Sequence, residues 1–191
     1  MIVLQTTGST PPDNLSPCFL FTRRAGAATV QLRAQSVPRG CIGVISDTHG
    51  LLRPEALVAL EGVGRILHAG DIGGPGLIDT LARIAPVTAI RGNVDRGSCA
   101  KALPETASIT AQGLRIHMIH DRKALRDDPI AEGWDVVISG HSHRPGIKEV
   151  AGVLWLNPGA AGPRRFHLPV TLAFLRVKDG RPCAAIHTLS V

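Results

Sequence analysis

The sequence predicts an α/β fold in which two mixed β-sheets pack face to face with helices on the outside. The first half of the folded region alternates short apolar runs with segments of helical periodicity, and this β-α-β-α-β order favours parallel strands. The second half contains strand-like runs and two hairpin patterns. Packing two such sheets against each other would bury these mixed strands.

We expect an irregular N-terminal extension, residues 1–38, followed by one domain, residues 39–191. The length of 191 residues is typical of a single hydrophobic core, and 44% hydrophobic with 19% charged residues allows that core to be sizeable. Residues 1–38 show no sustained periodicity and contain several prolines, which predicts irregular structure.

The elements of the first half follow one another in a regular order. A short apolar run at 41–46 ends in polar residues and indicates a buried strand. Pro54 stands in the first turn of the next segment, which has helical spacing of its apolar residues. The predicted elements are a strand over 41–46, a helix over 53–63, a strand over 65–69, a helix over 77–84 and a strand over 87–90.

The second half is predicted to be mostly strands. Two pairs of apolar runs are separated by short turns that contain glycine, which is typical of β-hairpins. The predicted elements are single strands over 114–119 and 136–139, a hairpin of 148–150 with 153–156, and a hairpin of 170–177 with 184–189.

The net charge of +6 suggests an anionic partner, but half of the excess lies in residues 1–40, with four arginines and one aspartate. The chain has four Phe, two Trp and no Tyr. Sequence-tolerant binding of single strands uses aromatic side chains on which bases stack. We therefore expect no dedicated nucleic-acid-binding module.

The cysteines indicate a reducing compartment. They are widely and irregularly spaced and form no C-x-x-C pair: Cys18, Cys41, Cys99 and Cys183. The first forty residues lack the pattern of a secretory signal, and no apolar stretch approaches the roughly 18 residues of a membrane span. We expect a cytoplasmic protein with no membrane partner.

Polar side chains that bind metals follow several of the predicted strands. These segments are Asp47-Thr48-His49, Gly70-Asp71, Gly92-Asn93, His120 and Gly140-His141-Ser142-His143. They offer two carboxylates, one amide oxygen and four imidazoles, enough for two adjoining sites for divalent ions. Asp47 and His49, two residues apart, can point the same way from an extended loop. Asp71 has two oxygens and can bridge two cations about 3.5–4 Å apart.

These segments resemble the signature of the calcineurin-like metallophosphoesterase superfamily. Four longer segments resemble its small YfcE-type bacterial and archaeal phosphodiesterases, and the resemblance spans about residues 41–190. They are residues 45–50, 68–71 and 140–145 and Asn157-Pro158-Gly159. The family fold, the metallo-dependent phosphatase fold, is a four-layer α/β/β/α sandwich of two mixed sheets, which is the layering that the resemblance implies.

The resemblance also assigns a role to each ligand. It implies a first metal held by Asp47, His49 and His143, a second held by Asn93, His120 and His141, and Asp71 as the bridge. It implies catalytic roles for Asp47, Asp71, Asn93 and His120. We expect two divalent ions per subunit, manganese first, with nickel, iron or zinc also suited to these ligands.

The implied function is hydrolysis of small or nucleotide phosphodiesters by a hydroxide that bridges the metals. Many relatives place a His after the Asn ligand, whereas Val94-Asp95 follows Asn93 here, which favours the diesterases. Asp121 stands where relatives commonly have Gly. The alternatives are a phosphomonoesterase or protein phosphatase of the same superfamily, and a non-catalytic scaffold like the retromer subunit that has lost part of its metal site.

Several other residues have both a functional and a structural interpretation. For His68 a supporting or packing role is favoured over metal contact. Three further histidines are interpreted as surface or satisfied residues: His117, His167 and His187. Arg164 and Arg165 could contact the substrate phosphate, but a solvated loop is the favoured reading. The sequence leaves the natural substrate and the oligomeric state open.

Overall fold

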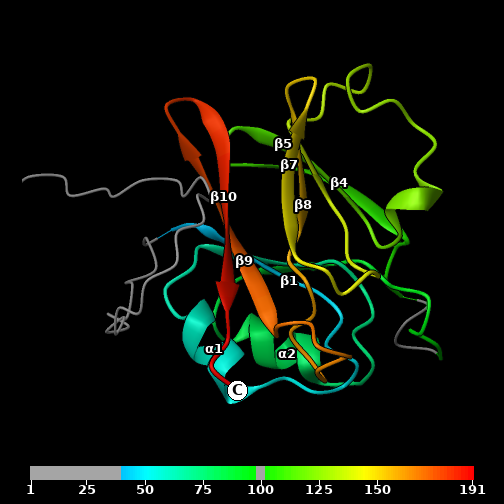
Figure 1. Ribbon diagram of the computed structural model, residues 1–191, viewed down its shortest axis with the longest axis vertical. Coiled ribbons are helices and arrows are strands. Elements are labelled where there is room, and N and C mark those ends of the chain that lie inside the picture. Colours follow the sequence, from blue (N-terminus) through cyan, green and yellow to red (C-terminus); the bar gives the residue numbers. More distant parts are fainter. Residues whose placement is uncertain (1–39, 98–101) are drawn as a thin grey trace, which may run out of the picture. The chain divides into compact units, whose positions relative to one another are not determined.

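The computed structural model describes residues 40–97 and 102–191 (Figure 1). The chain divides into two units, 1–33 and 34–191, and the fold below is that of the second unit. The predicted N-terminal extension, Cys18 and Cys99 lie outside the described residues.

The first sheet is mixed and has the strand order β10-β9-β1-β2-β3. Its strands are β1 (Ile42–Ile45), β2 (Arg65–His68), β3 (Val87–Ala89), β9 (Thr171–Lys178) and β10 (Arg181–Thr188). β1, β2 and β3 pair in parallel, while β9 is antiparallel to both β1 and β10. The parallel strands are connected by α1 (Pro54–Leu60) and α2 (Leu77–Ala82), as the alternating pattern predicted.

The second sheet is also mixed, with the order β4-β5-β6-β8-β7. Its strands are β4 (Thr106–Ala111), β5 (Leu114–Ile119), β6 (Val136–Ile138), β7 (Gly146–Val150) and β8 (Val153–Asn157). β5, β6 and β8 are parallel to one another, and the edge strands β4 and β7 pair antiparallel with β5 and β8.

Strand β4 is absent from the sequence-based prediction. Its sequence TASITA contains one large apolar residue, Ile109, so the hydrophobic signal is weak. The strand forms a hairpin with β5 through Gln112-Gly113, both of which have positive φ (53° and 79°). This is the backbone of a two-residue hairpin turn, which a non-glycine residue at the first position conceals in the sequence.

Three apolar clusters separate the layers of the domain. Leu60 and Leu81 of the two helices pack with Ile66 beneath the first sheet. Val44 and Met118 belong to the cluster between the sheets. The third cluster covers the outer face of the second sheet and consists of four buried residues: Ile119, Trp134, Val137 and Val153. This confirms the predicted fold class of two mixed sheets covered on their outer faces.

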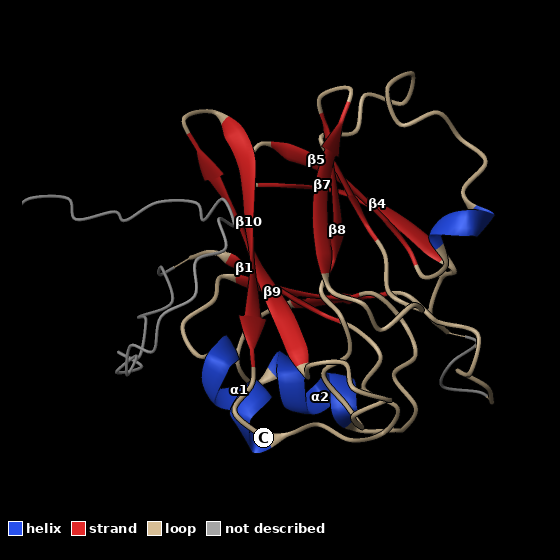
Figure 2. Cartoon of the chain, in the orientation of Figure 1, coloured by secondary structure: helices blue, strands red, loops and turns tan. Residues whose placement is uncertain are grey.

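The two outer layers differ in their content. Figure 2 shows α1 and α2 together, whereas the 3-10 helix η1 (Arg122–Ala124) lies apart from them near β4. Leu125, directly after η1, packs against the cluster on the outer face of the second sheet. Within the described residues, no helix combines the length and the hydropathy needed to cross a membrane.

Some predicted boundaries are wrong by a few residues. Helix α1 ends at Leu60 rather than at residue 63, because Gly62 adopts a left-handed conformation with a φ of 82°. β7 begins at Gly146 rather than at residue 148, and β10 begins at Arg181 rather than at residue 184. The pairing partners extend these strands beyond their apolar runs.

Leu60 should contribute strongly to the stability of the domain, because its side chain is fully buried under the first sheet. We expect Leu60→Ala to lower the free energy of unfolding by about 2–5 kcal/mol. Val58 lies on the same helix with 65% of its surface exposed, so Val58→Ala should change it by less than about 0.5 kcal/mol. Chemical denaturation measures both, and equal effects would contradict this packing.

Candidate metal centre

The candidate ligands lie in loops at the carboxyl ends of the strands. The loop after β1 is held against the loop after β2, since the N–H groups of Asp47 and His49 donate to the carbonyls of Gly70 (3.0 Å) and Asp71 (2.9 Å). Strands that run parallel end at the same edge of a sheet, which explains why segments far apart in sequence meet here.

The backbone of these loops is unusual. Five of the seven candidate ligands have positive φ, between 45° and 64°: Asp47, His49, Asp71, His141 and His143. Non-glycine residues seldom adopt this left-handed conformation, and when they do they cluster at functional sites. The loops therefore turn sharply at the ligands themselves.

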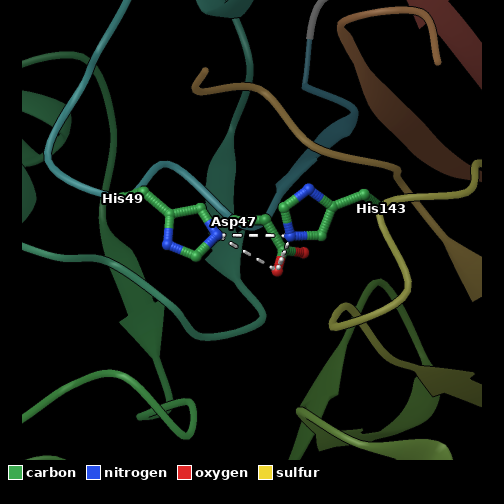
Figure 3. A group of neighbouring side chains, drawn as sticks. All are labelled: Asp47, His49 and His143. Carbon is green, nitrogen blue, oxygen red and sulfur yellow. Dashed lines mark hydrogen bonds and ion pairs between the residues drawn. The ribbon is translucent and has the colours of Figure 1, made fainter. Parts of the chain in front are cut away.

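Asp47, His49 and His143 form the first cluster (Figure 3). The Nε2 atoms of His49 and His143 lie 3.2 Å apart. Asp47 Oδ1 lies 3.2 Å from the Nε2 of His143 and 4.0 Å from that of His49. This oxygen is buried without a hydrogen-bond partner. Three ligand atoms thus approach a common point, which is the arrangement that a cation would satisfy.

Asp71 lies between this cluster and a second one. Its Oδ2 atom lies 3.9 Å from the Nε2 of His49 and 3.2 Å from the Nε2 of His120. Ligand atoms of Asp47, Asp71 and His120 all lie within 4.8 Å of one another. The Nε2 of His120 is buried and has no hydrogen-bond partner.

Asn93 and His141 lie at the exposed side of the second cluster. Their side chains form a hydrogen bond, with 3.0 Å between His141 Nδ1 and Asn93 Oδ1. The His141 ring stands edge-on to that of His120, with 5.3 Å between the centroids. Asp121, the residue that departs from the family pattern, places its Oδ2 3.9 Å from the Nε2 of His141. All seven sequence-predicted ligands are therefore neighbours, five of them closely packed.

A hydrogen bond to the backbone shows which ring nitrogen of His120 carries the hydrogen. Its Nδ1 lies 2.7 Å from the carbonyl oxygen of Ala69, which can only accept, so Nδ1 carries the hydrogen. In the neutral ring the lone pair is then on Nε2, which faces Asp71. A backbone acceptor of this kind is the usual partner of a metal-binding imidazole.

The electrostatics of the first cluster suit cation binding. Burial raises the pKa of Asp47 to about 6. Burial lowers the pKa of His49 below its ordinary value and that of His143 to about 4. At neutral pH both rings are thus uncharged and offer lone pairs, while the carboxylate is ionised in surroundings that do not neutralise it.

Asp71 and His120 are electrostatically coupled. Burial raises the pKa of the Asp71 carboxyl, but its contact with His120 and the hydrogen bond from the Val94 N–H outweigh burial, so the pKa lies below its ordinary value. Burial lowers the pKa of His120, yet Asp71 and the Ala69 carbonyl raise it overall. A cation would compete with this proton for the same nitrogen.

Asp95 holds the two central loops together, a role that the sequence did not reveal. Its carboxylate accepts hydrogen bonds from the N–H groups of Ile72 (3.1 Å), Gly73 (2.9 Å) and Gly92 (2.8 Å). The first two belong to the loop of Asp71 and the third adjoins Asn93. Both oxygens are used for positioning, which argues against the role of proton donor for Asp95.

Two glycines make room for the carboxylates. A Cβ atom on Gly92 would collide with the Asp71 carboxylate, and one on Gly140 would collide with the Ser46 hydroxyl and approach the Asp47 carboxylate. The backbone here is therefore as close to the ligands as sterics allow.

His68 is a supporting residue that contacts the ligand loops, as the sequence predicts. Its Nε2 lies 2.9 Å from Thr48 Oγ1, which itself donates to the carbonyl of Ile72 at 3.0 Å. Its Nδ1 accepts from the N–H of Gly70. Burial lowers the pKa of His68 to about 4, so the ring is neutral and links the loops that carry Asp47 and Asp71.

Asn157 supports the loop that carries His141 and His143. Its amide donates to the carbonyl of Gly140 (2.7 Å) and to the hydroxyl of Ser142 (3.1 Å), and its oxygen accepts from Gly159 N–H. The Asn157-Pro158-Gly159 segment thus shapes a turn beside the site.

The two arginines of the loop after Asn157-Pro158-Gly159 have different surroundings. Arg164 donates to the carbonyl oxygen of Val191 at 3.1 Å. Arg165 is exposed, and its positive charge contributes to the lowered pKa values of His49 and His143.

Two of the remaining histidines lie in the sheets. His117 stacks on Trp134 with 3.8 Å between ring centroids and contacts Ser108 through Nδ1 at 2.8 Å. His187 packs edge-on against Phe174. Both are packed side chains of strands, consistent with their structural interpretation, whereas His167 lines a small cavity.

Comparison with known proteins gives one family. A sequence model described as the calcineurin-like phosphoesterase superfamily domain matches residues 41–180. A probable metallophosphoesterase of Methanothermobacter thermautotrophicus is 39% identical over 131 residues, which cover 62% of this chain and 76% of the relative.

Two solved structures share the fold. One is an archaeal phosphodiesterase with 26% identity and a TM-score of 0.65, covering 77% of this chain and 99% of that one. The other is wild-type Vps29 of Entamoeba histolytica in complex with Zn²⁺, with 26% identity and a TM-score of 0.64, covering 78% and 93%.

Asp95→Asn should weaken metal binding without changing any ligand. One amide oxygen cannot replace two carboxylate oxygens that accept three N–H groups, so the loops of Asp71 and Asn93 would lose their alignment. We expect the dissociation constant for Mn²⁺, measured by calorimetric titration, to rise about 10–100-fold.

The matched control is Asp128→Asn. Asp128 also accepts a backbone N–H, that of Ile130 at 3.0 Å, but belongs to the turn-rich segment before β6. Its substitution should leave the dissociation constant unchanged. Equal affinities for the parent and Asp95→Asn would refute the positioning role.

Proposed function

Because the chain belongs to the calcineurin-like phosphoesterase superfamily, we propose that it is a two-metal phosphodiesterase that hydrolyses small or nucleotide phosphodiesters. The observation that carries this proposal is the position of Asp71. Its Oδ2 lies 3.9 Å from His49 Nε2 of the first cluster and 3.2 Å from His120 Nε2 of the second, so this carboxylate would be able to bridge two cations.

The side chains present fit two divalent ions. Asp47 Oδ1 and His120 Nε2 are buried polar atoms without hydrogen-bond partners, and a cation would satisfy both. In the proposed assignment the first ion takes Asp47, His49 and His143, and the second takes Asn93, His120 and His141, with Asp71 shared. We propose manganese as the working metal on the family resemblance, since the mixed oxygen and nitrogen ligands suit manganese, nickel, iron and zinc alike.

The chemistry supplied by the two ions, when bound, is a hydroxide at neutral pH and stabilisation of charge on the phosphoryl oxygens. The protein contributes orientation. Ala69 holds the ring of His120, and the Val94 N–H (3.0 Å) holds one oxygen of Asp71. Arg165 adds positive charge on the side of His49 and His143, where it can attract the substrate phosphate.

A diester is the proposed substrate because the site offers no side chain to protonate a leaving group next to Asn93. Val94 follows Asn93, and Asp95 uses both oxygens to accept backbone hydrogen bonds. The similarity to the archaeal phosphodiesterase supports the same choice. We also propose that the protein acts in the cytoplasm, in line with its irregular cysteine spacing.

A non-catalytic scaffold is the second candidate, because the Vps29 structures have similar folds. One of these Vps29 structures holds Zn²⁺, so metal binding alone does not separate the two functions. The enzyme is favoured because all seven candidate ligands are present and lie near one another, and turnover separates the two candidates.

Removal of metal should abolish hydrolysis of bis(p-nitrophenyl) phosphate, and Mn²⁺ should restore it, since the protein supplies no other nucleophile in the centre. The release of p-nitrophenol after dialysis against a chelator measures this. Asp71→Asn should stay inactive at saturating Mn²⁺, because a neutral amide is a poor bridge. Full activity in excess chelator would contradict the two-metal mechanism, and inactivity with every divalent ion would favour the scaffold.

Reaction rates should depend steeply on the leaving group. General acid catalysis is typically worth about 10²–10⁴-fold, and without it a poor leaving group departs slowly. In a series of aryl diesters with graded phenol pKa, assayed at one pH with saturating Mn²⁺, kcat should fall as the phenol pKa rises. A flat series, with the chemical step shown to limit the rate, would mean that a proton donor acts in the site.

A further inference from the structure

The loop of residues 161–169 leaves directly from the candidate metal centre. Its base is closed by the bridge between Ala160 and Val170. At its start, Ala161 N–H donates to the Ser46 carbonyl at 3.0 Å and Gly162 N–H to the Asp47 carbonyl at 3.3 Å. The loop is therefore anchored to the strand end that supplies a metal ligand.

A cavity of about 280 Å³ lies between this loop and the loop of the histidine ligands. Its lining residues are Ser142, Arg144, Phe166, His167 and Leu168. Ser142 stands between His141 and His143 in the chain, and Arg144 follows His143. The cavity is thus lined by the chain neighbours of two candidate ligands, and its volume, just below the usual range for ligand sites, suits one ring-sized group.

Phe166 is the most exposed of the large hydrophobic residues in the described chain, with 89% of its surface accessible. It belongs to none of the three apolar clusters found there. Its φ of 53° is a strained conformation for a bulky residue. Strain of this kind, held by an anchored loop, is characteristic of functional positions. The ring is accessible for stacking against a planar group.

The charges beside Phe166 suit an anionic ligand. Arg165 is its exposed neighbour in the chain, and Arg144 lines the cavity. Arg164 donates to the Val191 carbonyl instead. The cavity thus combines the aromatic ring of Phe166 with the positive charge of Arg144, and Arg165 adds a second exposed cation next to Phe166.

We propose that this cavity is the subsite for the organic group of the substrate, that Phe166 stacks on a nucleobase there, and that the substrate class is a small nucleotide phosphodiester. This rests on the proposed function and adds the feature that is recognised beyond the phosphate. A polymer is disfavoured, because the described residues of this cavity place two neighbouring rings, Phe166 and His167, on one loop rather than the successive aromatic platforms of single-strand-binding proteins.

Product binding tests the subsite independently of turnover. In the Mn²⁺-loaded full-length protein, AMP should bind at least about tenfold more tightly than ribose 5-phosphate, which lacks the base, since stacking on one aromatic ring has that magnitude. Phe166→Ala should remove the difference by weakening AMP alone, and Phe166→Trp should retain it. Calorimetric titration gives all the dissociation constants.

Ile130→Ala is the control, because Ile130 is also an exposed apolar residue, but in the segment before β6. It should leave the preference for AMP unchanged. Equal affinity for AMP and ribose 5-phosphate in the parent, or a preference that survives in Phe166→Ala, would overturn the subsite.

Diester hydrolysis by the same preparations separates the two proposals. Metal-dependent cleavage of bis(p-nitrophenyl) phosphate without a preference for AMP would overturn the subsite and leave the phosphodiesterase function standing. A preference for AMP that depends on Phe166, in a protein that cleaves no diester with any divalent ion, would support the subsite as a nucleotide-binding site and overturn the phosphodiesterase function.

Discussion

The close approach of buried ionisable groups is the constraint on which the rest of this domain depends. Asp47 Oδ1 and His120 Nε2 are enclosed by protein, and each lies 3.2 Å from another candidate ligand, His143 and Asp71 respectively, with which it forms an ion pair only when the imidazole is protonated. An unpaired buried polar atom costs about 1–3 kcal/mol, and a charged one more. The raised pKa of Asp47 expresses the same cost. A fold that tolerates this arrangement is stabilised when a cation binds, which links the stability of the centre to its occupancy.

Much of the surrounding backbone is organised to hold these groups close together. Ligands such as Asp47 and Asp71 adopt left-handed conformations, and Gly92 and Gly140 lack the Cβ atoms that would displace the carboxylates. Asp95 joins two loops through three hydrogen bonds. The packed sheets supply the rigid platform, because parallel strands end at one edge and present their loops together.

The sequence predicted the two-sheet fold and the neighbourhood of the candidate ligands, because both depend on local patterns. Apolar runs ending in Asp or His mark strand ends, and their order brings the loops together. Strand β4 escaped prediction because Ile109 is its single large apolar residue. The roles of Asp95 and Phe166 could not be predicted from the sequence either. Asp95 accepts from two N–H groups that lie 22 and 23 residues away in the chain, and the importance of Phe166 lies in an exposure that only the folded loop reveals.

The most direct test of a centre bridged by Asp71 is the location of its ions. Crystals grown with Mn²⁺ should give two anomalous scattering peaks about 3.5–4 Å apart, each within bonding distance of an Asp71 oxygen, with His49 and His120 on opposite ions. A single peak, or two peaks that do not share Asp71, would contradict the account.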